Sequence, residues 1–157
     1  MKYKIGQYRR FAEDDFKQLE INMGEGFAPY QSTCVHAQQY AEKMLKEKQV
    51  EFGMDPRFEH NLVTILNELS VNGLPITEDI YSKASILSNY YMTARYPGYK
   101  DLEFGEETAA EAYQYSLDIV GYIDMFFMDE GGNICMREPV ASQNRKKRSL
   151  LDRLRRR

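Results

Sequence analysis

The sequence contains few of the residues that form disulfides and metal sites, with only two cysteines and two histidines among 157 residues. Cys34 and Cys135 lie far apart, and their spacing matches neither a disulfide framework nor a zinc pattern. His36 and His60 are isolated and have no obvious third ligand. We therefore expect two free thiols, no metal site and no cofactor.

Long apolar runs and nucleotide-binding loops are also missing. No apolar run reaches the roughly 18 residues of a membrane-spanning helix, and the segment after Met1 lacks the apolar core of a signal peptide. There is no P-loop, no G-x-G-x-x-G and no Ser-His-Asp or Cys-His arrangement, so an NTPase, a dehydrogenase and a covalent hydrolase have no support. These absences predict a cytoplasmic protein with no transmembrane segment.

Acidic and basic side chains are distributed unevenly along the chain. Residues 1–143 carry 13 basic and 23 acidic side chains, a net charge of −10, whereas residues 144–157 have a net charge of +7. An acidic body is not by itself a nucleic-acid surface, because phosphate contacts need clustered lysine and arginine. The C-terminal tail can supply that cluster, which comprises Arg145, Lys146, Lys147, Arg148, Arg153, Arg155, Arg156 and Arg157.

No useful length of sequence alternates with the period of a β-strand, whereas apolar residues recur at steps of three and four in five segments. We predict an all-α, up-and-down antiparallel bundle of about five helices over residues 1–128, a linker over 129–143 and a disordered basic tail over 144–157. The five apolar stripes are Tyr8, Ala12, Phe16, Leu19 and Met23; Cys34, Ala37, Ala41, Met44 and Leu45; Phe58, Leu62, Ile65, Leu66 and Leu69; Ile80, Ala84, Leu87 and Tyr91; and Ala110, Tyr113, Leu117, Val120 and Phe127, with Asp124 interrupting the last.

Caps and prolines predict where several helices begin and end. Pro29 is placed as a first-turn proline of the second helix. Asp55 followed by Pro56 predicts the start of the third, and Thr77 can cap the fourth. Pro97 then ends the fourth helix, because a proline disfavours helical geometry in the residue before it.

Two motifs identify a family. The segment from Cys34 to Lys46 reads H-A-Q-Q-x-A-E-K-x-L-K after its first two residues, and a downstream helix ends in A-R-Y-P at Arg95. Together, in this order and at this separation, they resemble the HEPN domain (higher eukaryotes and prokaryotes nucleotide-binding) over about residues 8–127. The resemblance implies a helical bundle, usually a homodimer. The family includes metal-independent RNases, toxin partners of nucleotidyltransferases, and non-catalytic nucleotide- or RNA-binding members.

The catalytic pair of the RNase members is incomplete in this chain. Those members use an arginine to hold the scissile phosphate and a histidine four to six residues later to move protons. Arg95 resembles that arginine, but positions 99, 100 and 101 are Tyr99, Lys100 and Asp101. The only histidines that can substitute are His36 and His60, and each can equally be a residue that packs or hydrogen-bonds between helices.

Each candidate binding residue can instead have a purely structural role. Arg95 can either bind phosphate or oppose the dipole at the end of its helix. Tyr91, Tyr96 and Tyr99 can stack on a base or wall the core. We expect Lys43 and Lys46 on the outer side of their helix, where they are either solvated charges or secondary contacts to an anion.

Three functions follow as hypotheses. The first is a non-catalytic nucleotide- or RNA-binding module that uses Arg95, Tyr96, Tyr99, Lys43 and Lys46, with a nucleotidyltransferase as a potential partner in a toxin-antitoxin or defence system. The second is a metal-independent endoribonuclease with Arg95 and His36 or His60. The third is a homodimeric interaction protein whose basic tail binds nucleic acid, an acidic protein or an anionic membrane surface, for which a mobile genetic element is one setting.

Overall fold

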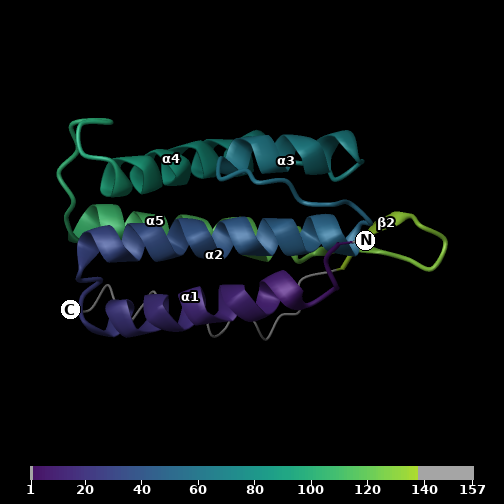
Figure 1. Ribbon diagram of the computed structural model, residues 1–157, viewed down its shortest axis with the longest axis horizontal. Helices are drawn as coiled ribbons and strands as arrows, with labels where there is room; N and C mark the ends of the chain where they lie inside the picture. The colour runs from purple at the N-terminus through teal and green to yellow at the C-terminus, as the bar shows by residue number, and fades with distance from the viewer. Residues whose placement is uncertain (1, 138–157) are drawn as a thin grey trace.

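The computed structural model describes residues 2–137, which form five helices and one short antiparallel hairpin (Figure 1). The all-α bundle predicted from the sequence is confirmed. The elements are α1 (Gln7–Gly24), α2 (Tyr30–Glu51), α3 (Leu62–Val71), α4 (Glu78–Arg95), α5 (Glu106–Ile123), β1 (Phe126–Met128) and β2 (Ile134–Met136). No helix in this part of the chain is long and apolar enough to cross a membrane.

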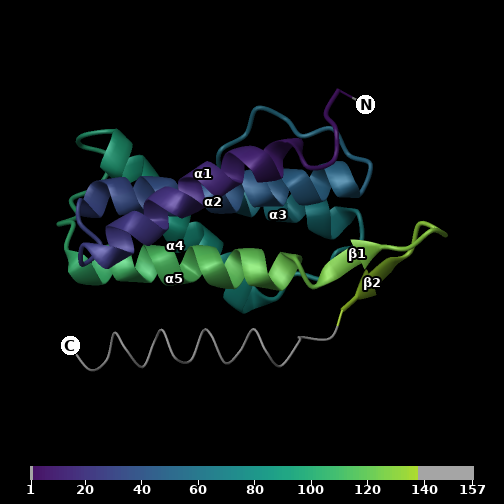
Figure 2. The same ribbon diagram turned by 90° about the horizontal axis from the view of Figure 1, so that it is seen from below.

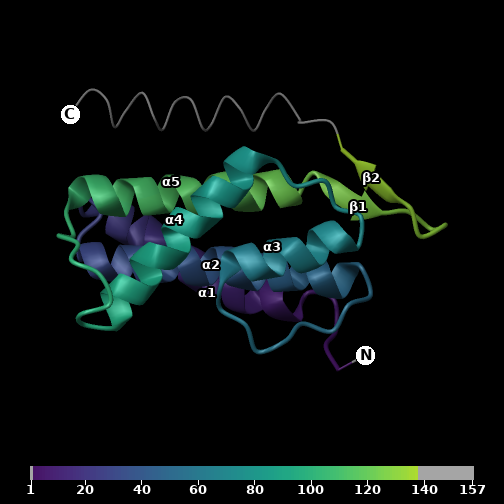
Figure 3. The same cartoon turned by 90° about the horizontal axis from the view of Figure 1, so that it is seen from above.

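Helix α2 is the centre of the bundle. It packs against each of the other four helices, and Figure 2 shows α1 and α5 beside it while the hairpin extends beyond one end. Because α2 is covered on so many sides, apolar and charged side chains alike are buried along it. Figure 3 shows the bundle from the face where α3 and α4 cover α2.

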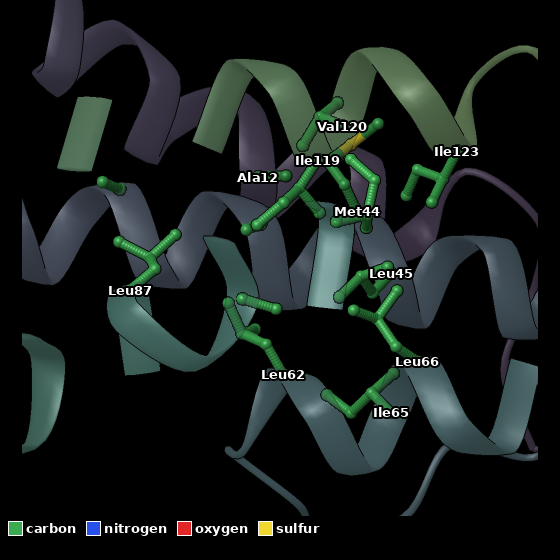
Figure 4. Packing of buried hydrophobic residues seen from close by; sticks show 14 of the residues in the cluster. Ala12, Met44, Leu45, Leu62, Ile65, Leu66, Leu87, Ile119, Val120 and Ile123 are labelled. Carbon is green, nitrogen blue, oxygen red and sulfur yellow. The ribbon is translucent and has the colours of Figure 1, made fainter. Parts of the chain in front are cut away.

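The apolar core lies on both sides of α2. Met44 faces Ile119 and Ile123 of α5, whereas Leu45 faces Leu66 of α3 (Figure 4). All five are at most 3% exposed. Burial of such side chains contributes about 1.5–3 kcal/mol each relative to exposure. Met44, Leu45 and Leu66 belong to the predicted apolar stripes, whereas the predicted stripe of the fifth helix is partly wrong. Ile119 and Ile123 are buried on α5, and the predicted Ala110 and Leu117 are only partly buried.

Both cysteines are free thiols, as predicted. Cys34 is buried within α2, and this burial raises the pKa of its thiol to about 12. It is therefore a core residue with no reactive thiolate at neutral pH.

A buried carboxylate attaches α1 to α2. Helix α1 has no side-chain cap of its own at Gly6. Glu47 of α2 accepts hydrogen bonds from the backbone N–H groups of Gly6, Tyr8 and Arg9 at 2.5, 3.1 and 3.2 Å. The negative charge also complements the positive end of the α1 dipole. A residue distant in sequence thus supplies the cap that is absent locally.

Two of the predicted helix boundaries are confirmed and two are wrong. The side chain of Thr77 accepts from the Ile80 N–H at 3.3 Å, and α4 ends at Arg95, two residues before Pro97. Pro29 is the N-cap of α2 rather than a first-turn residue. The third helix begins at Leu62, because Asn61 caps it by accepting from the Val63 N–H at 2.9 Å.

The segment from Gly53 to Asn61 is therefore a loop, and Asp55 and Pro56 do not start a helix. Phe58, predicted on the buried stripe of the third helix, is instead 94% exposed. The loop returns the chain from the end of α2 to the middle of the bundle (Figure 3). It thereby brings His60 alongside α2 and α4.

The fifth helix is shorter than predicted, and a hairpin follows it. Phe127 lies in β1 and pairs with Cys135 of β2. In the turn, the Asp129 carboxylate accepts from the backbone N–H groups of Gly131 and Asn133 at 2.9 and 2.8 Å. These hydrogen bonds, chiefly those from Asn133, lower the pKa of Asp129. Three-residue strands are too short to give a period-two signal. The predicted basic tail lies outside the described residues.

Candidate functional site

Arg95 is an exposed cation at the end of α4. The chain leaves the helix at Tyr96, whose N–H donates to the Met92 carbonyl at 2.9 Å. The Arg95 guanidinium carbon lies 5.5 Å from the centre of the Tyr91 ring. Among residues 2–137 no carboxylate forms an ion pair with it, and it donates no hydrogen bond to a helix carbonyl. Its charge is therefore available to an anion from solution.

The three tyrosines around Arg95 have different environments. Tyr91 is buried, and this burial raises the pKa of its hydroxyl, which stays neutral beside the cation. Tyr96 and Tyr99 are 52% and 46% exposed. Tyr91 thus walls the core and supports Arg95, whereas Tyr96 and Tyr99 present open ring surface to solvent.

His60 is the histidine near this site. Its ring centre lies 6.5 Å from that of Tyr91, the residue that also supports Arg95. Its Nδ1 lies 3.1 and 3.2 Å from the two carboxylate oxygens of Glu42. A carboxylate on Nδ1 favours the tautomer that leaves Nε2 as the acceptor in the neutral ring. The His60 side chain is 44% exposed, so a ligand can reach it.

Glu42 is the centre of a buried polar network. It is 4% exposed, and its Oε1 lies 2.9 Å from the Lys46 ammonium. Its Oε2 accepts from Gln38 and Gln39 at 3.0 and 3.2 Å. Gln38 also donates to the His60 carbonyl at 2.8 Å. The network therefore fixes both the backbone and the ring of His60.

The two lysines predicted as anion contacts already have carboxylate partners. Lys46 is 6% exposed and paired with Glu42, so its predicted place on the outer side of the helix is wrong. Lys43 is partly exposed, and its ammonium pairs with the buried Asp15 of α1. Their role in anion binding stays a prediction.

His36 lies in a different cluster from His60. Its Nδ1 is 2.9 Å from the carboxylate of Asp15, the same residue that pairs with Lys43. This cluster joins α1 to α2, and within the described part of the chain no hydrogen bond or ion pair links it to Arg95. Of the two histidines, the structure thus brings His60 towards Arg95.

Two residues of the site were not identified from the sequence. Glu42 stands four residues after Gln38 and four before Lys46, a spacing that places all three on one helix face. That pattern indicates a polar cluster, but not that the cluster is buried. Phe58 meets the His60 ring edge to face, at 4.8 Å between centres and 79° between planes. In the described part of the chain, no three metal-ligating side chains come together.

Comparison with known proteins establishes the family. The HEPN domain model matches residues 6–125. The chain belongs to the HEPN family. A comparison with curated protein sequences gives no match.

Two solved structures have the same HEPN fold. TT1696 from Thermus thermophilus is 24% identical, with a TM-score of 0.62, over 74% of this chain and 93% of that one. ST0689, an archaeal HEPN homologue, is 23% identical, with a TM-score of 0.61, over 78% of this chain and 96% of its own. At these identities the similarity shows the fold alone.

Proposed function

We propose that this HEPN protein binds RNA or a nucleotide, without catalysis, at a site formed by Arg95, Tyr96 and Tyr99. The observation that carries the proposal is the exposed Arg95 guanidinium, which has no carboxylate partner among the described residues and lies beside exposed rings. A guanidinium donates a fork of hydrogen bonds that fits phosphate. Exposed aromatic faces stack on bases of any sequence.

The basic tail is the main competing source of affinity. We expect a chain that ends at Gln143 to keep most of its affinity for a short RNA while its salt dependence becomes shallower, because eight cations are removed. Fluorescence anisotropy of a labelled RNA at several salt concentrations measures both. Complete loss of binding on truncation would place the function in the tail instead.

A metal-independent endoribonuclease is the second candidate. The observation that favours it is the pairing of half-exposed His60 with buried Glu42. The His60 ring lies near Tyr91, the residue that supports Arg95. In this candidate, His60 would take the place of the histidine that is missing after Arg95. Such a pair can move protons while the arginine stabilises the phosphate.

Cleavage of mixed cellular RNA in EDTA distinguishes the two candidates. We expect the RNA to stay intact with wild type, with His60→Ala and with His36→Ala. The enzyme candidate instead requires cleavage that disappears in His60→Ala and survives in His36→Ala, since His36 is the matched histidine in the other cluster. That pattern would replace the binding proposal with the nuclease.

A further inference from the structure

We infer that the loop from Gly53 to Asn61 extends the Arg95 site into a track for single-stranded RNA, with Phe58 as a platform for an unpaired base. This inference rests on the proposed function. The extended site would recognise a nucleobase next to a phosphate, which both a free nucleotide and a single-stranded RNA can supply. The loop favours the RNA.

Exposed aromatic rings gather around this site. Within residues 2–137 the exposed large hydrophobic residues include four aromatics, Phe11, Phe58, Tyr96 and Tyr99. Tyr96 and Tyr99 directly follow Arg95, and Phe58 packs on His60. Three of the four rings therefore lie on the two loops that border the site. Each of the three has a cation next to it in the sequence: Arg57 before Phe58, Arg95 before Tyr96 and Lys100 after Tyr99. Single-strand grooves combine cations and stacking rings in this way.

Phe58 is exposed and contacts one other ring. Its ring is 94% exposed, so it gains almost nothing from burial. Its contact with His60 nevertheless links it to a ring that is fixed by Glu42. An exposed ring beside a positioned neighbour is accessible for stacking on a base.

The two acidic residues of the loop accept hydrogen bonds from backbone N–H groups and keep their negative charge. The Glu59 carboxylate accepts from the backbone N–H groups of His60 and Asn61, both at 2.8 Å. The Asp55 carboxylate accepts from the Lys2 backbone N–H at 3.4 Å. Arg57, between them, is mostly exposed and lies 3.9 Å from Glu68. Arg57 is thus a mostly exposed cation next to Phe58 in the sequence, and its ion pair with Glu68 is long.

Positive charge continues beyond the start of the loop. The hydrogen bond from Lys2 to Asp55 places the N-terminal segment beside the loop, as Figure 2 shows. An open surface pocket of about 540 Å³ in the N-terminal segment is lined by Lys2, Lys4 and Arg10, among others. Lys2 thus lies near the start of the loop, Arg57 within it and Arg95 beyond its other end. Several separate cations suit a chain of phosphates better than one mononucleotide.

Anisotropy with a labelled 12-nucleotide single strand, the matching duplex, and ATP as competitor tests the inference on the full-length protein. The variants are Phe58→Ala, Phe58→Tyr and, as a matched exposed apolar control on α3, Val71→Ala. We expect wild type to prefer the single strand. Phe58→Ala should weaken that binding about tenfold and leave duplex binding unchanged. Phe58→Tyr and Val71→Ala should bind as wild type.

Each contrary result has a distinct meaning. Equal affinity for single strand and duplex, or no effect of Phe58→Ala, would overturn this inference while the Arg95 proposal stands. Competition by ATP as strong as that of the unlabelled strand would overturn it too and assign the site to a free nucleotide. Failure of RNA and ATP alike to bind would overturn the proposed function as well.

Discussion

Replacing Glu42 with alanine should lower the free energy of unfolding by about 3–5 kcal/mol, because the Lys46 ammonium is then left buried without a counter-charge. Both residues are almost fully buried, and Glu42 also accepts from Gln38, Gln39 and His60. The substitution removes the acceptor shared by all these donors. Urea denaturation followed by circular dichroism measures the change.

Two comparisons make this prediction specific. Adding Lys46→Met to Glu42→Ala should recover much of the loss, since the uncompensated charge is then gone. Arg57→Ala, which breaks an exposed pair with Glu68, should change stability by less than about 1 kcal/mol. A loss below about 1 kcal/mol for Glu42→Ala alone would mean that the network is not closed to water as described.

Replacing Arg95 with alanine should weaken RNA binding about 10- to 100-fold while the fold is retained. A hydrogen bond to a charged group contributes about 1.5–3 kcal/mol, which corresponds to this range. Arg95→Lys should lie between wild type and alanine, because lysine keeps the charge but not the planar fork. Anisotropy titration gives the affinities, and thermal unfolding checks the fold.

Arg137 provides a matched control. Its guanidinium carbon lies 4.9 Å from the centre of the Phe127 ring, so it is also an exposed arginine over an aromatic ring, but on the hairpin. Arg137→Ala should leave RNA affinity nearly unchanged. If Arg95→Ala and Arg137→Ala weaken binding equally, the RNA affinity reflects overall positive charge and Arg95 does not form a specific binding site.

The fold was predictable from the sequence because apolar periodicity and the HEPN motifs pointed to the same bundle. The errors arose where contacts across the bundle decide local structure. Asp55 and Pro56 have the local chemistry of a helix start, but Asn61 caps the helix and leaves a loop before it. Glu47 caps α1 from another helix, which no local pattern reveals.

The candidate site was predictable only in part. Arg95 was identified from its motif, and its exposure agrees with a binding role. The sequence could not choose between His36 and His60, because their positions depend on how α1 and the loop before α3 pack on α2. For Lys46, an i,i+4 partner at Glu42 was visible, but burial of the pair depends on the neighbouring elements.

The most direct test of the central claim is to locate bound RNA on the protein. A single-stranded RNA that contains 4-thiouridine is crosslinked to the full-length protein by ultraviolet light in EDTA, and the modified peptides are sequenced by mass spectrometry. We expect crosslinks in residues 95–100 and at Phe58. Crosslinks confined to residues 144–157 would contradict this expectation and assign RNA binding to the basic tail.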